Sequence, residues 1–457
     1  MQLTLLGLAL AFLVALVAAL VGPHFIDWNR FRPQFEAAAA RVVGVPVRVT
    51  GDMRATLLPV PSLRLKAVEV GDQGGGLGRA SADALAVEFN LGALMRGEWR
   101  ATELTVNGMA LDFGLDWRGR IAWPAGMGGV DLTTLAIDRL NVTGRIALHD
   151  GASRTTLELE DIAFSGDVRS LAGAVRGEGN ASIDGVRYPF RISSNPTAGG
   201  EGMKLHAVVT SPAQAFGLDL DGTLRFAASR PQFDGALTLE RRGGGDKGGL
   251  PWRIATRLKA DPAAARFEQF EVTYGADTMA AKLSGGGEMR FGAAPQLRVS
   301  LDARQIDADR LLRAAPDPGG GAGTGWTTLS ALVAGLALPP VPVTVEASAE
   351  TVTLGGRPVQ GVTATLRGDA TDWAIDRLAA RAPGATDIVI REAVVWPGDG
   401  GGFSGGVEIA TTDPDAFAAW LRGRSDAAPR IERPLRAAGR LSIDARRLAV
   451  EELSADL

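Results

Sequence analysis

The first pattern along the chain is a long apolar run near its amino terminus. Residues 3–21, LTLLGLALAFLVALVAALV, contain one polar residue, Thr4, and no charge. At about 1.5 Å of rise per residue, a helix of this length matches the hydrocarbon core of a bilayer. A cleaved signal peptide, cut near Val17 to Ala19, is the competing interpretation, but the usual positive amino-terminal region is absent. The pattern therefore predicts an uncleaved transmembrane anchor over residues 1–22.

A short stretch with helical periodicity follows this run. Apolar residues recur three or four positions apart and would share one helical face, while charged residues lie elsewhere on the wheel. The apolar face carries Trp28, Phe31, Phe35, Ala39 and Val42. Asn29 is the expected N-cap, and Gly44 stands where a left-handed residue commonly ends a helix. The sequence thus predicts an amphipathic helix within residues 23–45, whose apolar face packs either on the first sheet or on the membrane surface.

From Pro46 onward the period changes from 3.6 to 2 and remains there. Alternation of apolar and polar residues is typical of strands with one dry and one wet face. In SLRLKAVEV the alternation slips phase at Lys66 and Ala67, then resumes with Val68. The apolar residues of the first strands, which are the candidate binding residues, are Leu63, Leu65, Leu85, Val87, Phe89, Leu111, Phe113 and Leu115.

Turn signals separate the strands at short intervals. Tight hairpins are predicted at Asp150-Gly151, Asp184-Gly185, Asp221-Gly222 and Gly355-Gly356, because these pairs tolerate positive backbone angles. Strands do not alternate with long helices, which excludes an α/β fold.

Three strands should lead directly into short surface helices. The segments are VVTSPAQAF from 208, SLDARQIDADRLL from 300 and EIATTDPDAFAAWL from 408, where a cap precedes an expected first helical turn. Glycine-rich stretches beginning at 241, 316 and 397 are predicted to be mobile loops rather than domain linkers, since the strand pattern continues on both sides.

Composition narrows the function classes. The 48 Lys and Arg residues are balanced by 52 Asp and Glu residues, so the basic surplus typical of nucleic-acid binders is absent. The chain has no Cys, which excludes disulfide bonds and thiolate metal sites.

Candidate chemistry is equally sparse. His24, His149 and His206 lack neighbours at metal-ligand spacing. Two Asp-x-Asp pairs, at 307 and 309 and at 413 and 415, are better explained by helix capping than by Ca²⁺. The stretch GGGAGTGW at 319 lacks the Lys-Ser or Lys-Thr of a phosphate loop. We therefore expect no catalytic residues, no metal and no cofactor.

Several motifs resemble the AsmA family of Gram-negative envelope proteins. They are the segment FIDWNRFRPQFEAAAARVVGVPVRVTGDMRATLLPVPSLRLKAVEVGD from 25, LGALMRGEW from 91, DWRGRIAW from 116 and PW at 251. Later segments that fit are LDARQIDADRLL, LAARAPGATD and DPDAFAAWL. The resemblance covers the whole chain and is strongest over residues 20–125.

The resemblance implies an anchor in the inner membrane, through residues 3–21, and a body in the periplasm. Arg30 and Arg32, taken alone, would place that side in the cytoplasm by the positive-inside rule, and we follow the family placement. AsmA-like proteins resemble bridge-like lipid transfer proteins, whose repeating β-sheet curls into a groove for phospholipid acyl chains. Two departures are the missing basic residues before the anchor and an end in mid-strand at AVEELSADL, as expected of a fragment or a short member.

Two folds compete for the strand region: a closed sandwich, and a single mostly antiparallel sheet curled around an open apolar groove. The modest, aromatic-poor side chains and the resemblance favour the groove. The expected domains are the anchor at 1–22, the amphipathic helix at 23–45, an AsmA-like β-groove at 46–240, and further groove repeats at 241–457.

The function expected from the resemblance is binding of phospholipid acyl chains in support of lipid transport or homeostasis between the inner and outer membranes. Trp28, Phe31 and Phe35 would lie at the membrane-proximal mouth of the groove. The alternative is a scaffold or assembly factor that pairs its strand edges with outer-membrane or periplasmic proteins. An enzyme is the third class, and the sequence offers it no candidate residues.

Overall fold

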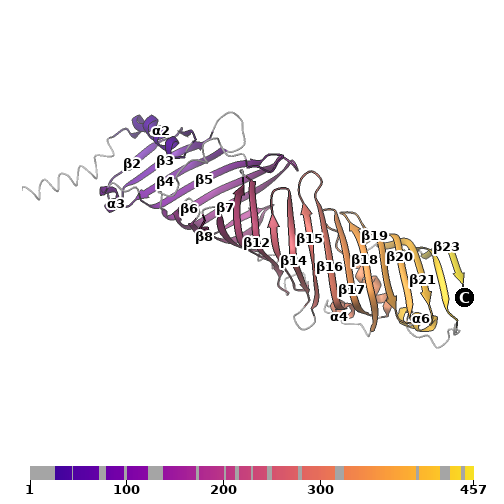
Figure 1. Cartoon of the computed structure of the whole chain (residues 1–457). Coiled ribbons are helices and arrows are strands. Elements are labelled where there is room, and N and C mark those ends of the chain that lie inside the picture. The colour runs from indigo at the N-terminus through magenta and orange to yellow at the C-terminus, as the bar shows by residue number, and fades with distance from the viewer. Residues whose placement is uncertain are drawn as a thin grey trace, which may run out of the picture. The chain divides into compact units, whose positions relative to one another are not determined.

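A computed structural model describes residues 26–456 (Figure 1), apart from residues 44, 72–78, 97–99, 122–136, 171–173, 200–201, 212–215, 228–229, 244–249, 276–279, 314–323, 398–400, 423–432 and 444–447. The predicted anchor lies outside the described residues, as do residues 244–249, 316–323 and 398–400 of the three glycine-rich stretches. The prediction of a loop was wrong for residues 402–406 of the third stretch, which belong to the strand β21 (Gly402–Thr411). Within the described part of the chain, no helix has the length and apolar character needed to span a membrane. The described residues are dominated by strands, which confirms the all-β class.

The chain divides into two compact units. The N-terminal unit comprises residues 1–212 and 218–233, and the C-terminal unit comprises residues 213–217 and 234–457. The domain limits expected from the sequence stay predictions.

The N-terminal unit begins with two short helical elements and continues as a sheet. Its elements are η1 (Trp28–Phe31), α2 (Arg32–Val43), β1 (Val47–Val49), β2 (Met53–Thr56), β3 (Ser62–Val70), β4 (Arg79–Phe89), α3 (Leu91–Met95), β5 (Ala101–Leu115), β6 (Ile137–Asp150), β7 (Thr155–Ser170), β8 (Ala174–Ile183), β9 (Val186–Pro196) and β10 (Met203–Ser211). Most of β11 (Phe216–Ala227) also belongs to it, and β12 (Arg230–Arg241) is divided between the units.

The described residues of the C-terminal unit form a second run of strands with three helices. Its elements are β13 (Trp252–Ala260), β14 (Ala264–Tyr274), β15 (Ala281–Arg290), β16 (Gln296–Asp307), α4 (Ala308–Arg313), α5 (Gly325–Ala334), β17 (Val343–Leu354), β18 (Arg357–Gly368), β19 (Trp373–Ala382), β20 (Thr386–Trp396), β21 (Gly402–Thr411), α6 (Pro414–Arg422), β22 (Leu435–Ile443) and β23 (Leu448–Asp456).

Strand pairing follows chain order in both units. In the N-terminal unit β1 and β2 both pair with β3, and each strand from β3 to β10 then pairs with the next. In the C-terminal unit the same succession runs from β13 to β23. These pairs are antiparallel except for β5 with β6 and β16 with β17, which are parallel.

The sheets are open. Among the described strands of each unit, the first and last are not paired with one another. The pairings do not establish the expected curl around a groove, and the fold is corrected to an open, mixed sheet.

Two of the predicted hairpins have the expected backbone. Asp184 and Gly185, between β8 and β9, have φ of 50° and 75°, and Gly355 and Gly356, between β17 and β18, have 61° and 72°. The prediction at Asp221-Gly222 was wrong, because that pair lies inside β11. Asp-Gly is only a turn signal, and strand pairing overrides it here.

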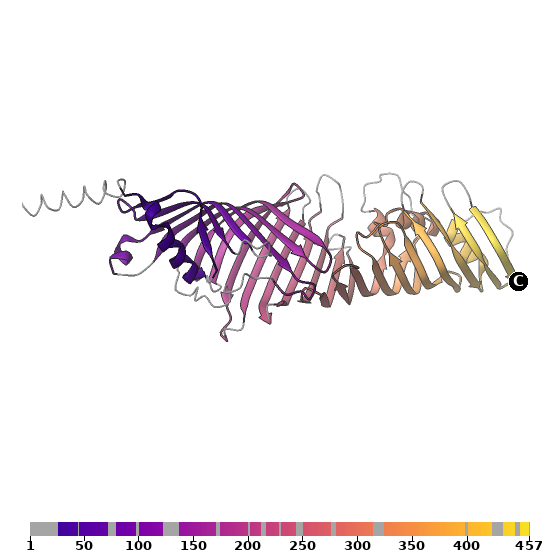
Figure 2. The same ribbon diagram turned by 90° about the horizontal axis from the view of Figure 1, so that it is seen from above.

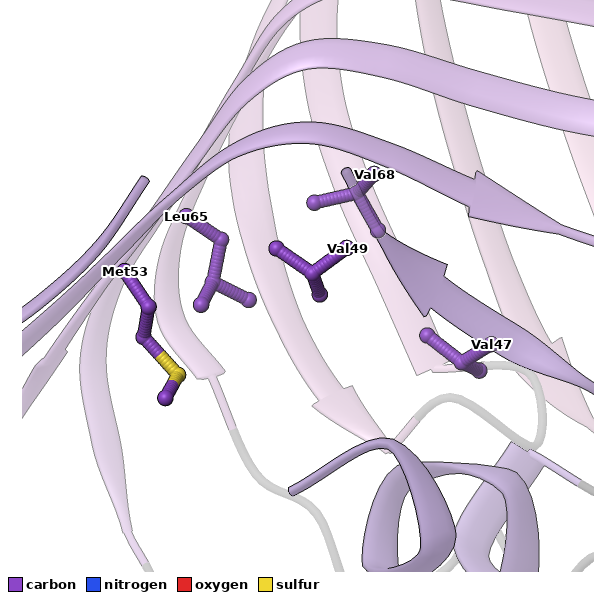
Figure 3. Close-up of a cluster of buried hydrophobic side chains, with 5 residues drawn as sticks. All are labelled: Val47, Val49, Met53, Leu65 and Val68. Atoms are coloured by element: carbon purple, nitrogen blue, oxygen red, sulfur yellow. The ribbon is translucent and has the colours of Figure 1, made fainter. Parts of the chain in front are cut away.

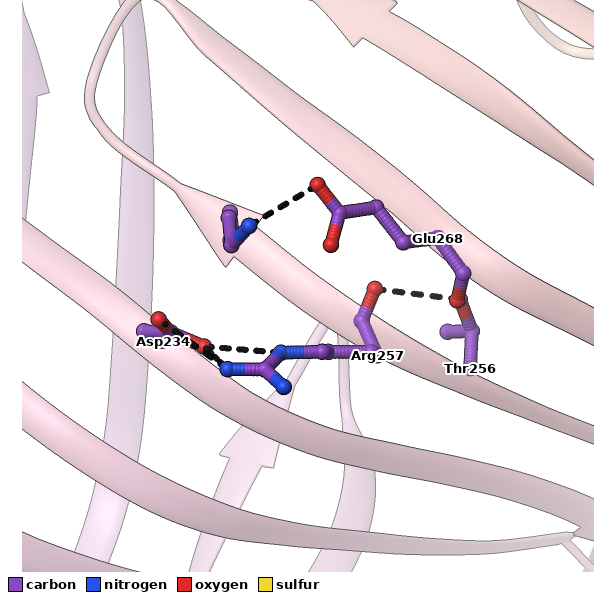
Figure 4. Close-up of polar contacts among 5 residues, drawn as sticks. Asp234, Thr256, Arg257 and Glu268 are labelled. Carbon is purple, nitrogen blue, oxygen red and sulfur yellow. Dashed lines mark hydrogen bonds and ion pairs between the residues drawn. The ribbon is translucent and has the colours of Figure 1, made fainter.

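Residues with a left-handed backbone interrupt several strands, and at Gln269 such a residue marks a bulge in the ladder. Ala67, where the sequence slips phase, has φ of 48°, and Gln269 on β14 has φ of 51°. The register of β14 shifts against both β13 and β15 around Gln269. Opposite that bulge, the buried Thr256 hydroxyl donates to the carbonyl oxygen of Glu268 at 2.9 Å, and Figure 4 shows the neighbouring Arg257 reaching Asp234. A bulge adds a residue to one strand and bends it locally.

The amphipathic helix lies on the first strands. Val47, Val49, Met53, Leu65 and Val68 form a buried cluster, drawn in Figure 3. Trp28, Phe35 and Ala39 pack against that cluster, so the helix has the sheet as its partner. Asn29 is not the N-cap; Asp27 caps η1, and the side-chain oxygen of Asn29 instead accepts from the backbone N–H of Met53 at 3.2 Å. Gly44 lies outside the described residues.

Two of the three predicted strand-to-helix connections are present. β16 leads into α4, and β21 leads into α6, where the Asp413 carboxylate accepts from the backbone N–H of Ala416 at 2.9 Å. The corresponding residues after β10, 212–215, lie outside the described part.

Candidate functional site: the apolar face of the sheet

Register brings apolar side chains of the N-terminal unit into rows that cross many strands. We call the side of the sheet that carries these rows the apolar face. One row runs Leu85, Val106, Val142, Phe164, Gly179, Phe190 and Val209 across β4 to β10. A second runs Leu63, Val87, Leu104, Leu140, Gly166, Gly177, Ile192 and Ala207 across β3 to β10. None of these positions carries a charge.

The predicted residues share this face but differ in how they are covered. Leu63, Leu65 and Leu85 pack in or against the cluster beneath α2, and Leu65 is only 2% exposed. Val87 packs against a second buried cluster, formed by Ala101, Ile137 and Val168. This end of the face is therefore a packed core.

The predicted residues on β5 are more open. Leu111 and Phe113 are only half-buried and pair with Ile146 and Leu148 on β6. Leu157, which pairs with Leu148, is 46% exposed. Leu115 and Phe89 lie at strand ends, opposite Asp150 and Ala101 respectively. The structure thus brings Leu111 and Phe113 together on a partly open surface.

Among the described residues, no second layer covers the middle of this face. In the described part of the N-terminal unit, helix packing on the sheet centres on η1 and α2 against its first strands, which form one end of the sheet (Figure 2). A single sheet has two faces, and an apolar face without a covering layer keeps its side chains partly in water. The half-buried state of residues from β5 to β10 follows from this.

Of the three predicted membrane-proximal residues, two pack against the sheet and one is exposed to solvent. Trp28 and Phe35 contact the buried cluster, while Phe31 is 46% exposed, with its ring centroid 6.0 Å from that of Trp28. α2 therefore covers one end of the apolar face and leaves Phe31 in contact with solvent.

The opposite face of the same strands is polar. It holds a hollow of about 690 Å³ lined largely by residues of both charge signs, including Arg139, Asp167, Arg176, Glu178 and Arg191. Arg191 and Glu178 approach to 3.3 Å. Because acids and bases alternate here, this hollow does not select an anion, and it would place an acyl chain beside charged groups.

The candidate chemical groups have local partners. His149 lies 2.9 Å from the Thr156 hydroxyl, and His206 lies 3.1 Å from Asp219, whereas His24 is outside the described residues. Within the described ranges no group of three or more His, Cys, Asp or Glu residues is placed to hold a metal ion.

Of the Asp pair at 307 and 309, only Asp307 has the predicted role of a helix cap. Asp307 accepts from the backbone N–H of Arg310 at 2.9 Å, as expected of a helix cap. The buried Asp309 differs: it accepts from the backbone of Gly355 and Gly356 and from the Thr328 hydroxyl, and so joins α4 to α5 and to the β17–β18 turn.

The C-terminal unit carries a similar apolar face, and none of the predicted binding residues lies on it. One row runs Leu258, Phe267, Gly287, Val299, Val345, Leu366, Ile375 and Ala393 across β13 to β20. The signal was present in the alternation of these strands, but strand partners cannot be chosen from alternation alone.

Comparison with known proteins addresses the amino-terminal part of the chain. Neither a search of curated proteins nor a search of solved structures gave a match. Residues 2–181 match the family model described as AsmA family. That range includes the amphipathic helix and the strands whose rows form the first half of the apolar face, so the predicted resemblance to the AsmA family is confirmed over residues 2–181.

Proposed function

We propose that the apolar face of the N-terminal sheet binds phospholipid acyl chains. In this proposal the protein is anchored in the inner membrane, its body lies in the periplasm, and it supports lipid transport or homeostasis between the inner and outer membranes without acting as an enzyme. The observation that carries the proposal is the set of uncharged rows from β5 to β10, left half-buried because no layer packs on them in the described structure.

The energetics favour an aliphatic occupant. Soluble proteins rarely leave contiguous apolar patches larger than a few hundred Å² in water, and such patches mark binding surfaces. Each methylene group buried on the face contributes roughly 0.8 kcal/mol. An acyl chain lying across several strands would therefore gain several kcal/mol without needing any polar partner.

The uncharged run at residues 3–21 supports the localisation part of the proposal, together with the match of residues 2–181 to the AsmA family model. The uncharged run is long enough to span a bilayer. η1 and α2 follow it and cover one end of the apolar face through Trp28 and Phe35. A lipid leaving the membrane beside the anchor would meet this end first.

Site-specific photocrosslinking in living cells tests the proposal on the full chain. A photoreactive phenylalanine analogue placed at Leu111, Phe113 or Leu148 should form adducts with ³²P-labelled phospholipid. Thr105 and Arg145, on the same two strands but on the polar face, are the matched controls and should give none. Equal labelling of both faces, or no labelled lipid at any position, would refute lipid binding on this face.

The same experiment addresses the scaffold function. If Leu111 and Phe113 formed adducts with outer-membrane proteins and not with phospholipid, assembly of those proteins would replace lipid binding as the proposed function.

Charge insertion provides a second measurement. Leu111→Glu should fold, reach the membrane and lose phospholipid adducts at Phe113, since its carboxylate can remain hydrated. Leu65→Glu, on the same face but 2% exposed, should instead lower the free energy of unfolding by at least ~3 kcal/mol. If Leu111→Glu unfolded as severely as Leu65→Glu, the face near β5 would be a closed core.

A further inference from the structure

A segment of the C-terminal unit is both uncharged and exposed. Residues 324–342, which contain α5, carry no charged side chain, although 22% of the chain is charged. Five large apolar side chains in this segment remain 37–43% exposed; they are Trp326, Leu329, Leu332, Leu336 and Leu338. A soluble helix normally turns charged or polar residues toward water, and a helix apolar on most sides is normally buried.

Helical spacing shows where part of this apolar surface points. Leu329 and Leu332 follow Gly325 by four and seven residues, so the three share one side of α5. Gly325 lies against the ring of Trp420, where an added Cβ would come within 2.7 Å of a ring atom. Thr328, on the adjoining stripe, donates to the buried Asp309 at 3.0 Å. The leucines therefore lie toward the body of the unit, yet both stay 37% exposed.

The sheet beside α5 is apolar and incompletely covered as well. Val333 of α5 packs with the buried cluster of Ile375, Ala393 and Val395. Leu366, Leu378, Ile390 and Phe403 surround that cluster and are only half-buried. Beyond the helix, the indole N–H of Trp373 donates to the carbonyl oxygen of Ala337 at 3.1 Å and holds the following segment near the same strands.

We propose that the segment from Trp326 to Leu338 and the apolar rows of β18 to β21 together form a second acyl-chain-binding surface, within the C-terminal unit. The inference rests on the proposed function and extends it to a helix that contributes to the lipid contact. The occupant is an aliphatic chain because every side chain offered to it is uncharged. Helices that lie on a bilayer surface usually carry Lys or Arg on their polar face, and α5 has only Thr and Ser there.

α5 is a fixed part of this surface. Asp309 connects α4, α5 and the β17–β18 turn, and Gly325 packs on Trp420 of α6. Both anchor points lie at the amino-terminal end of α5, whereas Leu332 and Leu336 lie beyond them. The surface is thus preorganised at one end, which lowers the ordering cost of binding.

Photocrosslinking of the full chain in cells tests the proposal. The photoreactive analogue at Leu329 and Leu332 should form ³²P-phospholipid adducts, and the same analogue at the exposed Thr327 and Ser330 of α5 should form at least about tenfold fewer. Leu332→Glu should lower the adducts at Leu329 by about tenfold or more, because a carboxylate beside an acyl chain loses hydration. Ser330→Glu is the matched control and should leave them unchanged.

The outcomes separate this proposal from the proposed function. Phospholipid adducts at Leu111 and Phe113 without any at Leu329 and Leu332 would overturn the second surface alone. Absence of phospholipid at all four positions would overturn both. Adducts of Leu329 or Leu332 with another protein, or with a second copy of this chain, would also overturn the second acyl-chain-binding surface. If Leu332→Glu failed to accumulate, Leu332→Gln provides an uncharged replacement, and the adducts at Leu329 in that variant should still fall.

Discussion

Phe164 and Phe190 stack across the strand that separates them. Their ring centroids are 6.3 Å apart and their planes differ by 8°, while Gly179 of β8 lies in register between them. A Cβ at Gly179 would come within 2.9 Å of the Phe190 ring and still closer to the carbonyl oxygen of Ala163. The two rings thus form a flat part of the apolar face that only glycine permits at the central position.

Gly179→Val should therefore disrupt this part of the sheet. We expect the free energy of unfolding to fall by about 1–3 kcal/mol, as for other overpacked sites, in chemical denaturation of the full chain. Gly199→Ala is the control, because a Cβ there meets no atom within 4 Å. Equal stability of the two variants would show that the rings do not depend on Gly179.

Gln269 should be replaceable by glycine with a gain in stability. Its φ of 51° lies in the left-handed region, which costs a residue with a side chain roughly 1–2 kcal/mol, partly offset by the greater chain entropy of glycine. Gln269→Gly should raise the free energy of unfolding by up to about 1 kcal/mol. Gln296→Gly, in an ordinary strand position of β16, should lower it by about 0.5–1 kcal/mol. If both variants lowered the free energy of unfolding, the backbone at Gln269 would not be strained.

Asp309 should control the order of α5. Asp309→Ala removes the acceptor for Thr328, Gly355 and Gly356. Of these donors Thr328 is buried, and a buried donor without a partner costs about 1–3 kcal/mol. Amide hydrogen exchange in α5 should accelerate strongly. Asp307→Ala removes a helix cap, worth about 1 kcal/mol, and an ion pair with Arg310, and should leave exchange in α5 nearly unchanged. If the amide exchange rates in α5 were similar in both variants, Asp309 would not control the order of α5.

Asp150 should make stability depend on acid pH. The hydrogen bond from the Ser153 hydroxyl, with backbone N–H donors of Ala152 and Ser153, holds the pKa of Asp150 below its ordinary value. A depressed folded-state pKa stabilises the fold above the unfolded-state pKa, and this contribution is lost as pH falls through the folded-state value. The stability difference between the native chain and Asp150→Asn should thus be largest at neutral pH and shrink below about pH 4. A difference independent of pH would contradict the assignment.

The strands and their apolar sides could be predicted because both depend on neighbouring residues. Leu111, Phe113 and Leu115 alternate with polar residues and lie on a strand as expected. Even the left-handed backbone at Ala67 was visible as a slip in phase. The same signal marks Gln269, where Phe267 and Phe270 are three positions apart instead of two.

The sequence could not predict which residues are buried or paired when this depends on residues far away in the chain. Leu65 and Leu111 look alike in the pattern, yet α2 buries the first, and no helix of the described structure packs closely on the second. Asp221-Gly222 has the composition of a turn but is held inside β11 by strand pairing. The orientation of α5, and so the direction of Leu329 and Leu332, depends on contacts with Asp309 and Trp420, which lie on other elements.

The succession of strands in chain order has a consequence for folding kinetics. Because each strand from β3 to β10, and from β13 to β23, pairs with its immediate neighbours in the chain, contact order within each unit is low for an all-β protein. Most contacts close short hairpins, so strands can be added one at a time to a growing sheet. Unfolding should likewise begin at the outermost strands and advance inward, which would appear as a gradient of amide protection along each unit instead of a single cooperative transition.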